Sequence, residues 1–353
     1  MGTRGVISFR RFMKLALYCP EIGYYERENE RVGRGGDFVT SVSTGSLFGQ
    51  LLAFQFASWC EDFSGPVQWV EAGAHDGRLA ADILAGARER SPELFERLNY
   101  CIVEPSERRQ GWQRKLLDPF GEKVRWVNSL QDLAREGVNG VFFSNELLDA
   151  FPVHRLGWDA GGKRWTEWGV GCAGERFEWR RMNENIRDWS ADLAAAGFDI
   201  PPELAAVLPD GFILEASPEA GQWWRDAAQA LRRGRLMTID YGLRAEQFLT
   251  PERRSGTLRS YRRHAVGNDL LSAPGEQDLT SHVNFSHLIR AGEEAGLKTE
   301  GMTSQAEFLA NLAQHLWASS IAPSPAEIRQ FQALTHPEHL GRAFRVLVQS
   351  RLS

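Results

Sequence analysis

Two acidic residues, each near the end of an apolar run, are the side chains of this sequence best suited to bind a ligand. Glu71 lies in V-Q-W-V-E-A, just ahead of Gly73, and Glu104 closes the run L-N-Y-C-I-V-E. Both runs have the length of a buried strand. In an open α/β sheet the ligand binds outside the carboxyl ends of the strands, so both acids are expected at its site. A carboxylate there can accept hydrogen bonds from an amine or from both hydroxyl groups of a ribose.

The turn after the first run narrows the identity of the ligand. Gly73 lets the backbone turn, Gly77 lets the next helix pack closely on the strand, and Asp76 lies between them. A dinucleotide fingerprint needs a second glycine where this chain has His75, whose side chain would crowd a pyrophosphate. The sequence also has no P-loop pattern G-x-x-x-x-G-K-[ST]. These features favour a ligand with an amine and a ribose but no phosphate, namely S-adenosylmethionine.

Two further strand ends complete the expected cofactor site. Ser129 follows a third apolar run and is placed to contact the adenine edge, and Asn145 follows a fourth. The alternative interpretation is that Glu71 and Glu104 only cap their strands and bind nothing.

The stretch N-E-L-L-D after the fourth run is expected to carry the chemistry. It brings Asn145, Glu146 and Asp149 to the place where a sulfonium would face its methyl acceptor. Methyl transfer is an in-line displacement, so positioning supplies much of the acceleration. With an amine or guanidinium acceptor, carboxylates would hold the cation and take its proton. The alternative is that Glu146 caps the next helix and Asp149 lies on the surface.

These residues need a sheet whose strands run in parallel. Apolar runs alternate with helical patterns from residue 66 onward, which is typical of a parallel sheet covered on both faces. The strands are expected at 67–72, 100–104, 124–127, 140–144 and 235–242. The helices between them are expected at 78–90, 107–117 and 219–232.

The rest of the chain is expected to elaborate this core, which comprises residues 66–152 and 211–353. Residues 1–65 form an N-terminal helical cap, with helices at 7–17 and 46–59. Residues 153–210 form an inserted subdomain for substrate or partner. Its first part alternates apolar and polar residues around the glycines 161–162, which predicts antiparallel strands, and a helical region follows at 186–208. Residues 243–285 are polar and irregular, as in long functional or disordered loops, and the pieces that look ordered are L-R-S-Y-R-R-H and P-G-E-Q-D-L-T-S-H-V-N-F. A helix at 285–295, a strand at 297–303, a helix at 306–316 and a strand at 344–349 close the chain.

Composition favours an ordinary globular protein. Hydrophobic residues make up 42% of the 353 residues, and the formal net charge of -5 gives no support to nucleic-acid binding. The four cysteines are far apart and form no C-x-x-C, and His282 and His287 lack metal-ligand spacing, so neither disulfides nor a metal site is expected. The two histidines are expected at a helix end or on the surface. Without a signal peptide or an apolar span of about 18 residues, we expect a cytoplasmic protein that does not enter membranes.

Six stretches together resemble the MidA family of S-adenosylmethionine-dependent methyltransferases, which includes the mitochondrial complex I assembly methyltransferase. The resemblance runs from about residue 8 to the end of the chain. It implies a class I methyltransferase fold, a Rossmann-like and mostly parallel sheet, with N-terminal helical elements and an inserted antiparallel and helical subdomain. The stretches are G-D-F-V-T-S at 36–41, V-E-A-G-A-H-D-G-R-L at 70–79, V-E-P-S at 103–106, N-E-L-L-D-A-F-P-V-H at 145–154, I-D-Y-G at 239–242 and P-G-E-Q-D-L-T-S-H-V-N-F at 274–285.

The mitochondrial members of this family imply dimethylation of a protein arginine, with a respiratory-complex subunit as a candidate partner. The residues expected to contact the substrate are Asp37, Tyr241, Gln277 and Asp278, which lie in three of the shared stretches. The sequence leaves the oligomeric state open, with a homodimer as one candidate.

Two other functions stay open. Family members carry a glycine at the place of His75, so this chain could be a catalytically silent binding or assembly factor that keeps the methyltransferase fold; the Trp-rich insertion suits that role. A nucleotide-dependent oxidoreductase ranks last, because the dinucleotide fingerprint is absent.

Overall fold

The chain folds into two compact units, each of which is described by itself. A computed structural model describes residues 5–27, 40–182, 189–262, 265–267, 269–318, 322–337 and 340–352. The sheet unit comprises Glu30–Leu147, Trp224–Tyr241 and Gly292–Ser353, and the insert unit comprises Met1–Asn29, Leu148–Trp223 and Gly242–Ala291. The expected division of the sequence into a cap at 1–65, a core and an insertion at 153–210 stays a prediction.

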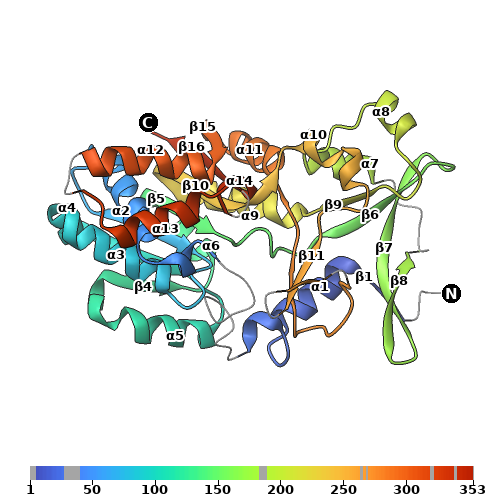
Figure 1. The fold of residues 1–353 in the computed structure, drawn as a ribbon, viewed down its shortest axis with the longest axis horizontal. Helices are drawn as coiled ribbons and strands as arrows, with labels where there is room; N and C mark the ends of the chain where they lie inside the picture. Colours follow the sequence, from blue (N-terminus) through green and yellow to red (C-terminus); the bar gives the residue numbers. More distant parts are fainter. Residues whose placement is uncertain are drawn as a thin grey trace. The chain divides into compact units, whose positions relative to one another are not determined.

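The sheet unit is built on a mostly parallel sheet, as expected (Figure 1). Its strands follow the order β15-β16-β10-β5-β2-β3-β4. All neighbours from β10 to β4 pair in parallel, whereas β16 runs antiparallel to both β10 and β15. The order along the sequence reverses at β2, which is the point where open α/β sheets bind ligands. The strands are β2 (Val67–Ala72), β3 (Leu98–Val103), β4 (Val124–Val127), β5 (Val138–Asn145), β10 (Leu231–Leu243), β15 (Lys298–Ser304) and β16 (Phe344–Arg351).

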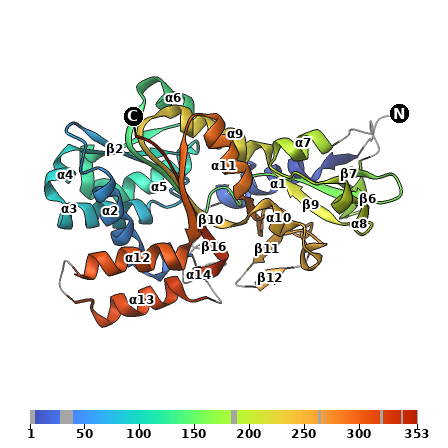
Figure 2. The same ribbon diagram turned by 90° about the horizontal axis from the view of Figure 1, so that it is seen from above.

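Helices cover this sheet on both faces. Figure 2 shows α2, α3 and α12 on one face and α6 on the other. On the first face a core of buried side chains includes Trp69, Phe56 and Phe143, and the rings of Phe56 and Phe143 lie 4.9 Å apart. The helices are α2 (Leu47–Trp59), α3 (Arg78–Arg90), α4 (Pro92–Arg97), α5 (Glu107–Leu117), α6 (Leu130–Glu136), α12 (Gln305–Ala318), α13 (Pro325–Thr335) and α14 (Leu340–Ala343). Short 3₁₀ turns lie at η2 (Val42–Thr44) and η3 (Asp118–Lys123).

The insert unit holds an antiparallel sheet of order β1-β7-β6-β9, with β8 also paired to β7. The expected hairpin turn at the glycines 161–162 joins β6 to β7 and is confirmed. A second small sheet has the order β12-β11-β13. The elements are β1 (Val6–Ser8), α1 (Phe9–Tyr18), η1 (Tyr24–Glu26), β6 (His154–Asp159), β7 (Arg164–Ala173), β8 (Arg176–Arg181), α7 (Ser190–Ala195), α8 (Pro202–Val207), β9 (Ile213–Ala216), α10 (Ala245–Phe248), η4 (Pro251–Arg253), β11 (Arg259–Arg262), β12 (Ala265–Gly267), β13 (Asp278–Thr280) and β14 (Val283–Asn284). Two helices, α9 (Pro218–Ala230) and α11 (Phe285–Glu294), share their residues between the units.

Four sequence expectations need correction. The first helix begins at Phe9, because residues 6–8 pair with β7 as a strand. Of the helical region expected at 186–208 the structure describes 189–208, which forms two short helices, since Gly197 has a φ of +83° and prolines follow at 201–202. Helix α9 ends at Ala230, where β10 starts directly. The region 243–285, expected to be irregular, contains the second small sheet, and β11 and β13 lie in its two ordered-looking pieces.

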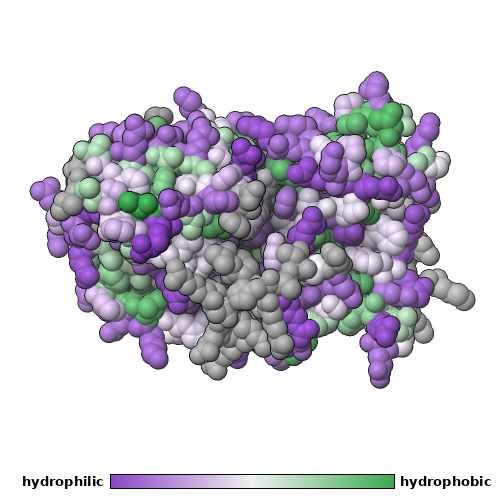
Figure 3. All heavy atoms as spheres, viewed as in Figure 1, coloured by the Kyte–Doolittle hydropathy of each residue, from purple (hydrophilic) through white to green (hydrophobic). Residues whose placement is uncertain are grey.

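Figure 3 shows one cluster of hydrophobic residues over α8, where Val207 is 74% exposed. Among the described residues, no helix is both long enough and apolar enough to span a bilayer.

Two glycines allow the central strands β2, β5 and β10 to approach one another closely. A Cβ at Gly140 in β5 would lie 2.2 Å from the carbonyl oxygen of Gln68. A Cβ at Gly234 in β10 would lie 1.8 Å from the carbonyl oxygen of Gly140. Both contacts are to backbone, which cannot rotate away.

We therefore expect Gly140→Ala to lower the free energy of unfolding by about 2 kcal/mol or more. Urea unfolding followed by circular dichroism measures it. The control is Gly111→Ala in α5, where an added Cβ meets no atom within 4 Å. That change should raise stability by up to about 1 kcal/mol through helix propensity. Equal effects of the two substitutions would contradict the packing argument.

Candidate cofactor site

The loop between β2 and α3 is a tight turn held by its own backbone. Gly73 and Gly77 have φ angles of +77° and +88°. The N–H of Gly77 donates to the carbonyl of Ala74 at 2.7 Å. Asp76 Oδ1 accepts from the N–H of Arg78, the first residue of α3, at 3.0 Å.

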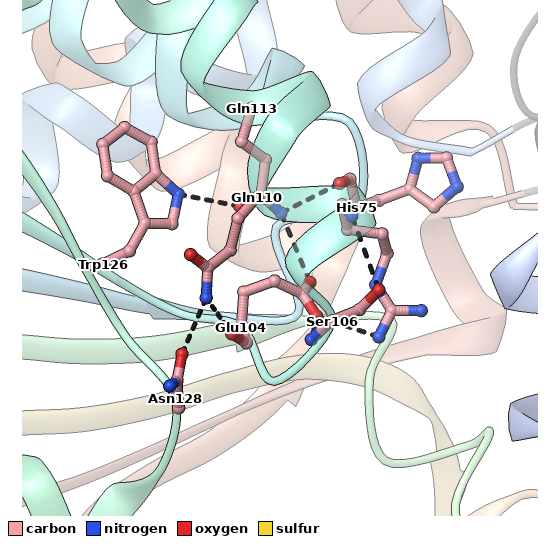
Figure 4. A network of polar contacts seen from close by, with 8 residues as sticks. His75, Glu104, Ser106, Gln110, Gln113, Trp126 and Asn128 are labelled. Atoms are coloured by element: carbon pink, nitrogen blue, oxygen red, sulfur yellow. Dashed lines mark hydrogen bonds and ion pairs between the residues drawn. The ribbon is translucent and has the colours of Figure 1, made fainter. Parts of the chain in front are cut away.

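His75 occupies the turn in a conformation that favours glycine. Its φ is +45°, and its side chain is 34% exposed. Figure 4 shows the imidazole directed away from Glu104 and Gln113. The backbone of His75 therefore follows the path that a glycine would take, at the cost that a left-handed non-glycine residue carries.

Gln113 of α5 joins three separate pieces of this site (Figure 4). Its Nε2 donates to the carbonyl oxygen of His75 at 2.9 Å and to Glu104 Oε2 at 3.3 Å. Its Oε1 accepts from Trp126 Nε1 in β4 at 2.9 Å. The side chain is fully buried. One amide thus fixes the turn after β2, the acid after β3 and the end of β4 relative to one another.

Glu104 follows β3 directly, is 2% exposed and has protein partners on both carboxylate oxygens. Oε1 accepts from the N–H of Ser106 and from Arg109 Nη2, each at 2.9 Å. Oε2 accepts from Gln113, as described above. The acid is therefore held rigidly at the strand end.

Glu71 is equally buried and is bonded to the neighbouring strand. Its Oε2 accepts from the hydroxyl of Tyr100 at 2.7 Å. Burial raises the pKa of Glu71 to about 7, and the hydrogen bond from Tyr100 limits that rise. Glu71 is thus a carboxyl group that changes charge near neutral pH.

The remaining expected cofactor residues follow β4 and β5. Ser129 precedes α6, and its hydroxyl donates to Asp132 at 2.9 Å. Asn145 ends β5, and its Nδ2 donates to Glu146 Oε1 at 3.2 Å. Asn145 Oδ1 is buried without a hydrogen-bond partner among the described residues, so this oxygen can accept from a ligand.

Glu146 has a φ of +50°, the left-handed region. Hydrogen bonds to acceptors of β10 hold it there. The N–H of Glu146 donates to the carbonyl of Ile239 at 2.9 Å, and that of Leu147 donates to Asp240 Oδ2 at 3.2 Å. Strain that the surrounding structure enforces at a strand end is common at functional sites.

Asp149 and the expected substrate residues Gln277 and Asp278 belong to the insert unit. The hydroxyl of Tyr25 donates to Asp278 Oδ1 at 2.8 Å. Burial, followed by the charges of Asp278, Tyr18 and Asp149, raises the pKa of Tyr25 well above its ordinary value. Asp149 is 5% exposed, so its expected surface alternative is wrong.

The other two expected substrate residues lie elsewhere. Tyr241, at the end of the sheet unit's share of β10, has its ring 3.9 Å from that of Phe344. Asp37 lies outside the described residues. The roles expected of Tyr241, Gln277 and Asp278 stay predictions.

The expectation for the two histidines holds in part: His287 lies at a helix end, as the third residue of α11, but it is buried, and His282 is half-buried. His287 is 5% exposed, and with His282 and Glu215 it lines a small cavity. The ring of His287 fits because Gly221 has no Cβ, which would lie 2.1 Å from His287 Nε2. In the part of the chain that the structure describes, no group of three or more metal-binding side chains comes together.

Sequence reasoning missed Gln113, Arg109 and Tyr100. Gln113 had a signal: it shares the buried face of α5 with Leu117, and a buried amide needs polar partners. Arg109 and Tyr100 had none, because an arginine in a helix and a tyrosine in a strand are ordinary at the sequence level.

Comparison with known proteins supports the fold and the cofactor class. Residues 51–303 match the sequence model of a family described as "putative S-adenosyl-L-methionine-dependent methyltransferase". A crystal structure of a "likely methyl transferase" from Burkholderia thailandensis, bound to S-adenosyl-homocysteine, is similar with a TM-score of 0.85. It is 33% identical, over 99% of this chain and 88% of that one.

Two curated relatives are the mitochondrial protein arginine methyltransferases NDUFAF7 of Danio rerio and Homo sapiens. They are 28% and 27% identical to this chain. The first alignment covers 99% of this chain and 85% of the relative, and the second covers 97% and 79%.

The fold and the cofactor class therefore agree with those expected from the sequence. The protein has a class I methyltransferase fold, and its cofactor is S-adenosylmethionine. The switch point at β2, a turn without a phosphate cradle and acids at two adjacent strand ends fit this cofactor. The chain belongs to the family of S-adenosylmethionine-dependent methyltransferases that matches residues 51–303, and the family expected from its motifs is confirmed.

The raised pKa of Glu71 makes a prediction about stability. The pKa is about 7 in the folded chain and near its ordinary value of 4.5 in the unfolded chain. Stability from this group is therefore fully present below about pH 4.5 and is lost as the pH rises through 7. The total is about 3 kcal/mol.

Glu71→Gln should remove this pH dependence, because the amide stays neutral and its oxygen still accepts from Tyr100. The measurement is urea unfolding of both proteins from pH 5 to 8, with exposed Glu93→Gln as control. Parallel profiles for wild type and Glu71→Gln would show that the carboxyl group does not titrate in this range.

Proposed function

We propose that this protein methylates an arginine side chain of another protein. The observation that carries the proposal is the pair Asn145–Glu146, a buried amide and a carboxylate fixed in a left-handed backbone at the end of β5. The pair belongs to the same unit as Glu71, Glu104 and the turn after β2. The names of the NDUFAF7 relatives support arginine as the acceptor.

The reaction needs a cation holder and a proton acceptor. The bond between sulfur and methyl breaks as a bond between a guanidinium nitrogen and the methyl forms, which leaves S-adenosylhomocysteine and one proton. In the proposal Glu146 orients the guanidinium and takes this proton, and Asn145 fixes the Glu146 carboxylate. Asp149 is proposed as a second carboxylate for the substrate, on the strength of its place in the same sequence stretch.

Cofactor binding is assigned to Glu71, Gly73, Asp76, Gly77, Glu104, Ser129 and Asn145. In this assignment Glu104 accepts from the ribose hydroxyls and Glu71 lies toward the amine. A protein partner, with a respiratory-complex subunit as one candidate, is proposed from the family resemblance. A cytoplasmic location stays a prediction, and the curated relatives are named as mitochondrial.

A silent binding or assembly factor is the second candidate function. Two observations favour it: His75 occupies a glycine-like position in the turn, and Arg109 already pairs with Glu104.

The cofactor assignment predicts the effect of Glu104→Gln. The amide keeps the shape but loses the charge that strengthens hydrogen bonds from the ribose, so affinity for S-adenosylhomocysteine should fall about tenfold or more. Isothermal titration calorimetry measures it, with Glu107→Gln on the exposed side of α5 as control. Unchanged affinity of Glu104→Gln would remove this acid from the site.

The catalytic assignment predicts a different effect for Glu146→Gln. This variant should bind S-adenosylhomocysteine like wild type yet methylate arginine at least 100-fold more slowly, because general-base catalysis and cation binding are both lost. Mass spectrometry of proteins co-expressed with each variant reports methylated arginine. Absence of methylated arginine with the wild type, in the presence of cofactor binding, would favour the silent binding factor.

A further inference from the structure

Hydrogen-bond capacity at Glu104 is the starting point. A carboxylate has about four acceptor positions, two on each oxygen. Ser106 and Arg109 use both positions of Oε1, and Gln113 uses one of Oε2. One position is left, whereas the two hydroxyls of a ribose need two. The protein itself therefore competes with the ribose for this acid.

The three partners differ in how readily they can give way. Ser106 donates through its backbone N–H. Because Ser106 is the N-cap residue of α5, this donor is fixed in place. Gln113 is fully buried and has two further hydrogen bonds. Arg109 acts through the end of a long side chain that is 11% exposed. Because its guanidinium ends a flexible side chain, it can be displaced from Glu104 without a shift of the backbone.

The charge of Arg109 also matters. It neutralises a carboxylate that is 2% exposed, so removing the arginine alone would leave a buried charge without its counter-ion and would destabilise the protein without ligand. A ribose replaces this cation with neutral donors. Whatever stabilisation the pair supplies must be given up, at least in part, when both hydroxyls bind.

We propose that Arg109 sets the affinity for the cofactor by competing with the ribose hydroxyls for Glu104. Arg109 is thus an affinity-determining residue that weakens binding, and the protein keeps a buried acid satisfied at the expense of cofactor affinity. The inference rests on the proposed role of Glu104 in ribose binding.

The test is the affinity of Arg109→Met for S-adenosylhomocysteine, measured by calorimetry. Methionine keeps much of the apolar stem and removes the competing donors, so the dissociation constant should fall about tenfold, equivalent to about 1.4 kcal/mol. The matched control is Arg108→Met, which removes the same charge from an exposed neighbour on α5 and should leave affinity unchanged. Arg109→Leu, which also has no hydrogen-bond donor, serves if the methionine variant fails to fold.

Two further measurements separate competition from a structural role. The melting temperature of Arg109→Met without ligand should be lower than that of wild type, and its rise on adding S-adenosylhomocysteine should be larger. With the 2′,3′-dideoxy analogue of S-adenosylhomocysteine, the gain in affinity should vanish, because this analogue offers Glu104 no hydroxyls.

Equal or weaker binding by both Arg109 variants would overturn the inference. An equal gain for the dideoxy analogue would do the same. If Glu104→Gln weakens binding while the Arg109 variants do not strengthen it, the ribose assignment stands and only the competition is wrong. If Glu104→Gln has no effect, the ribose assignment itself fails.

Discussion

The three hydrogen bonds of the Gln113 side chain are the constraint on which the cofactor site depends. Parallel strands place their ends at one edge of the sheet, but they do not fix the loops that leave them. Gln113 does so for the turn at His75, the acid Glu104 and the strand that carries Trp126. Because the amide is buried, the loss of any one partner would leave a polar atom without compensation. Helix α5, which carries Gln113, therefore fixes the positions of these loops at the edge of the sheet.

This constraint also explains how the turn accommodates His75. A residue with a Cβ in the left-handed region carries a cost, and the turn must be held by other interactions. The carbonyl of His75 accepts from Gln113, and the N–H of Gly77 closes the turn from the other side. These two hydrogen bonds stabilise the turn although a histidine replaces the glycine. The imidazole is directed away from Glu104 and Gln113 (Figure 4).

Much of the fold of the sheet unit could be predicted from the sequence, because strands buried on both faces read as continuous apolar runs. The bounds of β2, α3, α5 and β4 agree with the expected ranges. The insert unit was harder. Strand β1 has only three residues and pairs with β7, which is remote in sequence, and the strands of the small sheet around β11 have only three or four residues each. The acids Glu71 and Glu104 could be located because the apolar runs that they end or follow predict the strands. Their hydrogen-bond partners could not, since Tyr100 and Arg109 meet them only through tertiary structure.

The left-handed backbone of Glu146 has a consequence for how this protein would respond to selection. Glycine adopts such a conformation without penalty, and asparagine tolerates it better than glutamate does. A screen that rewards resistance to heat alone would therefore draw position 146 toward those residues and discard the carboxylate. A glutamate is expected to persist at this position only under selection for a property other than thermal stability.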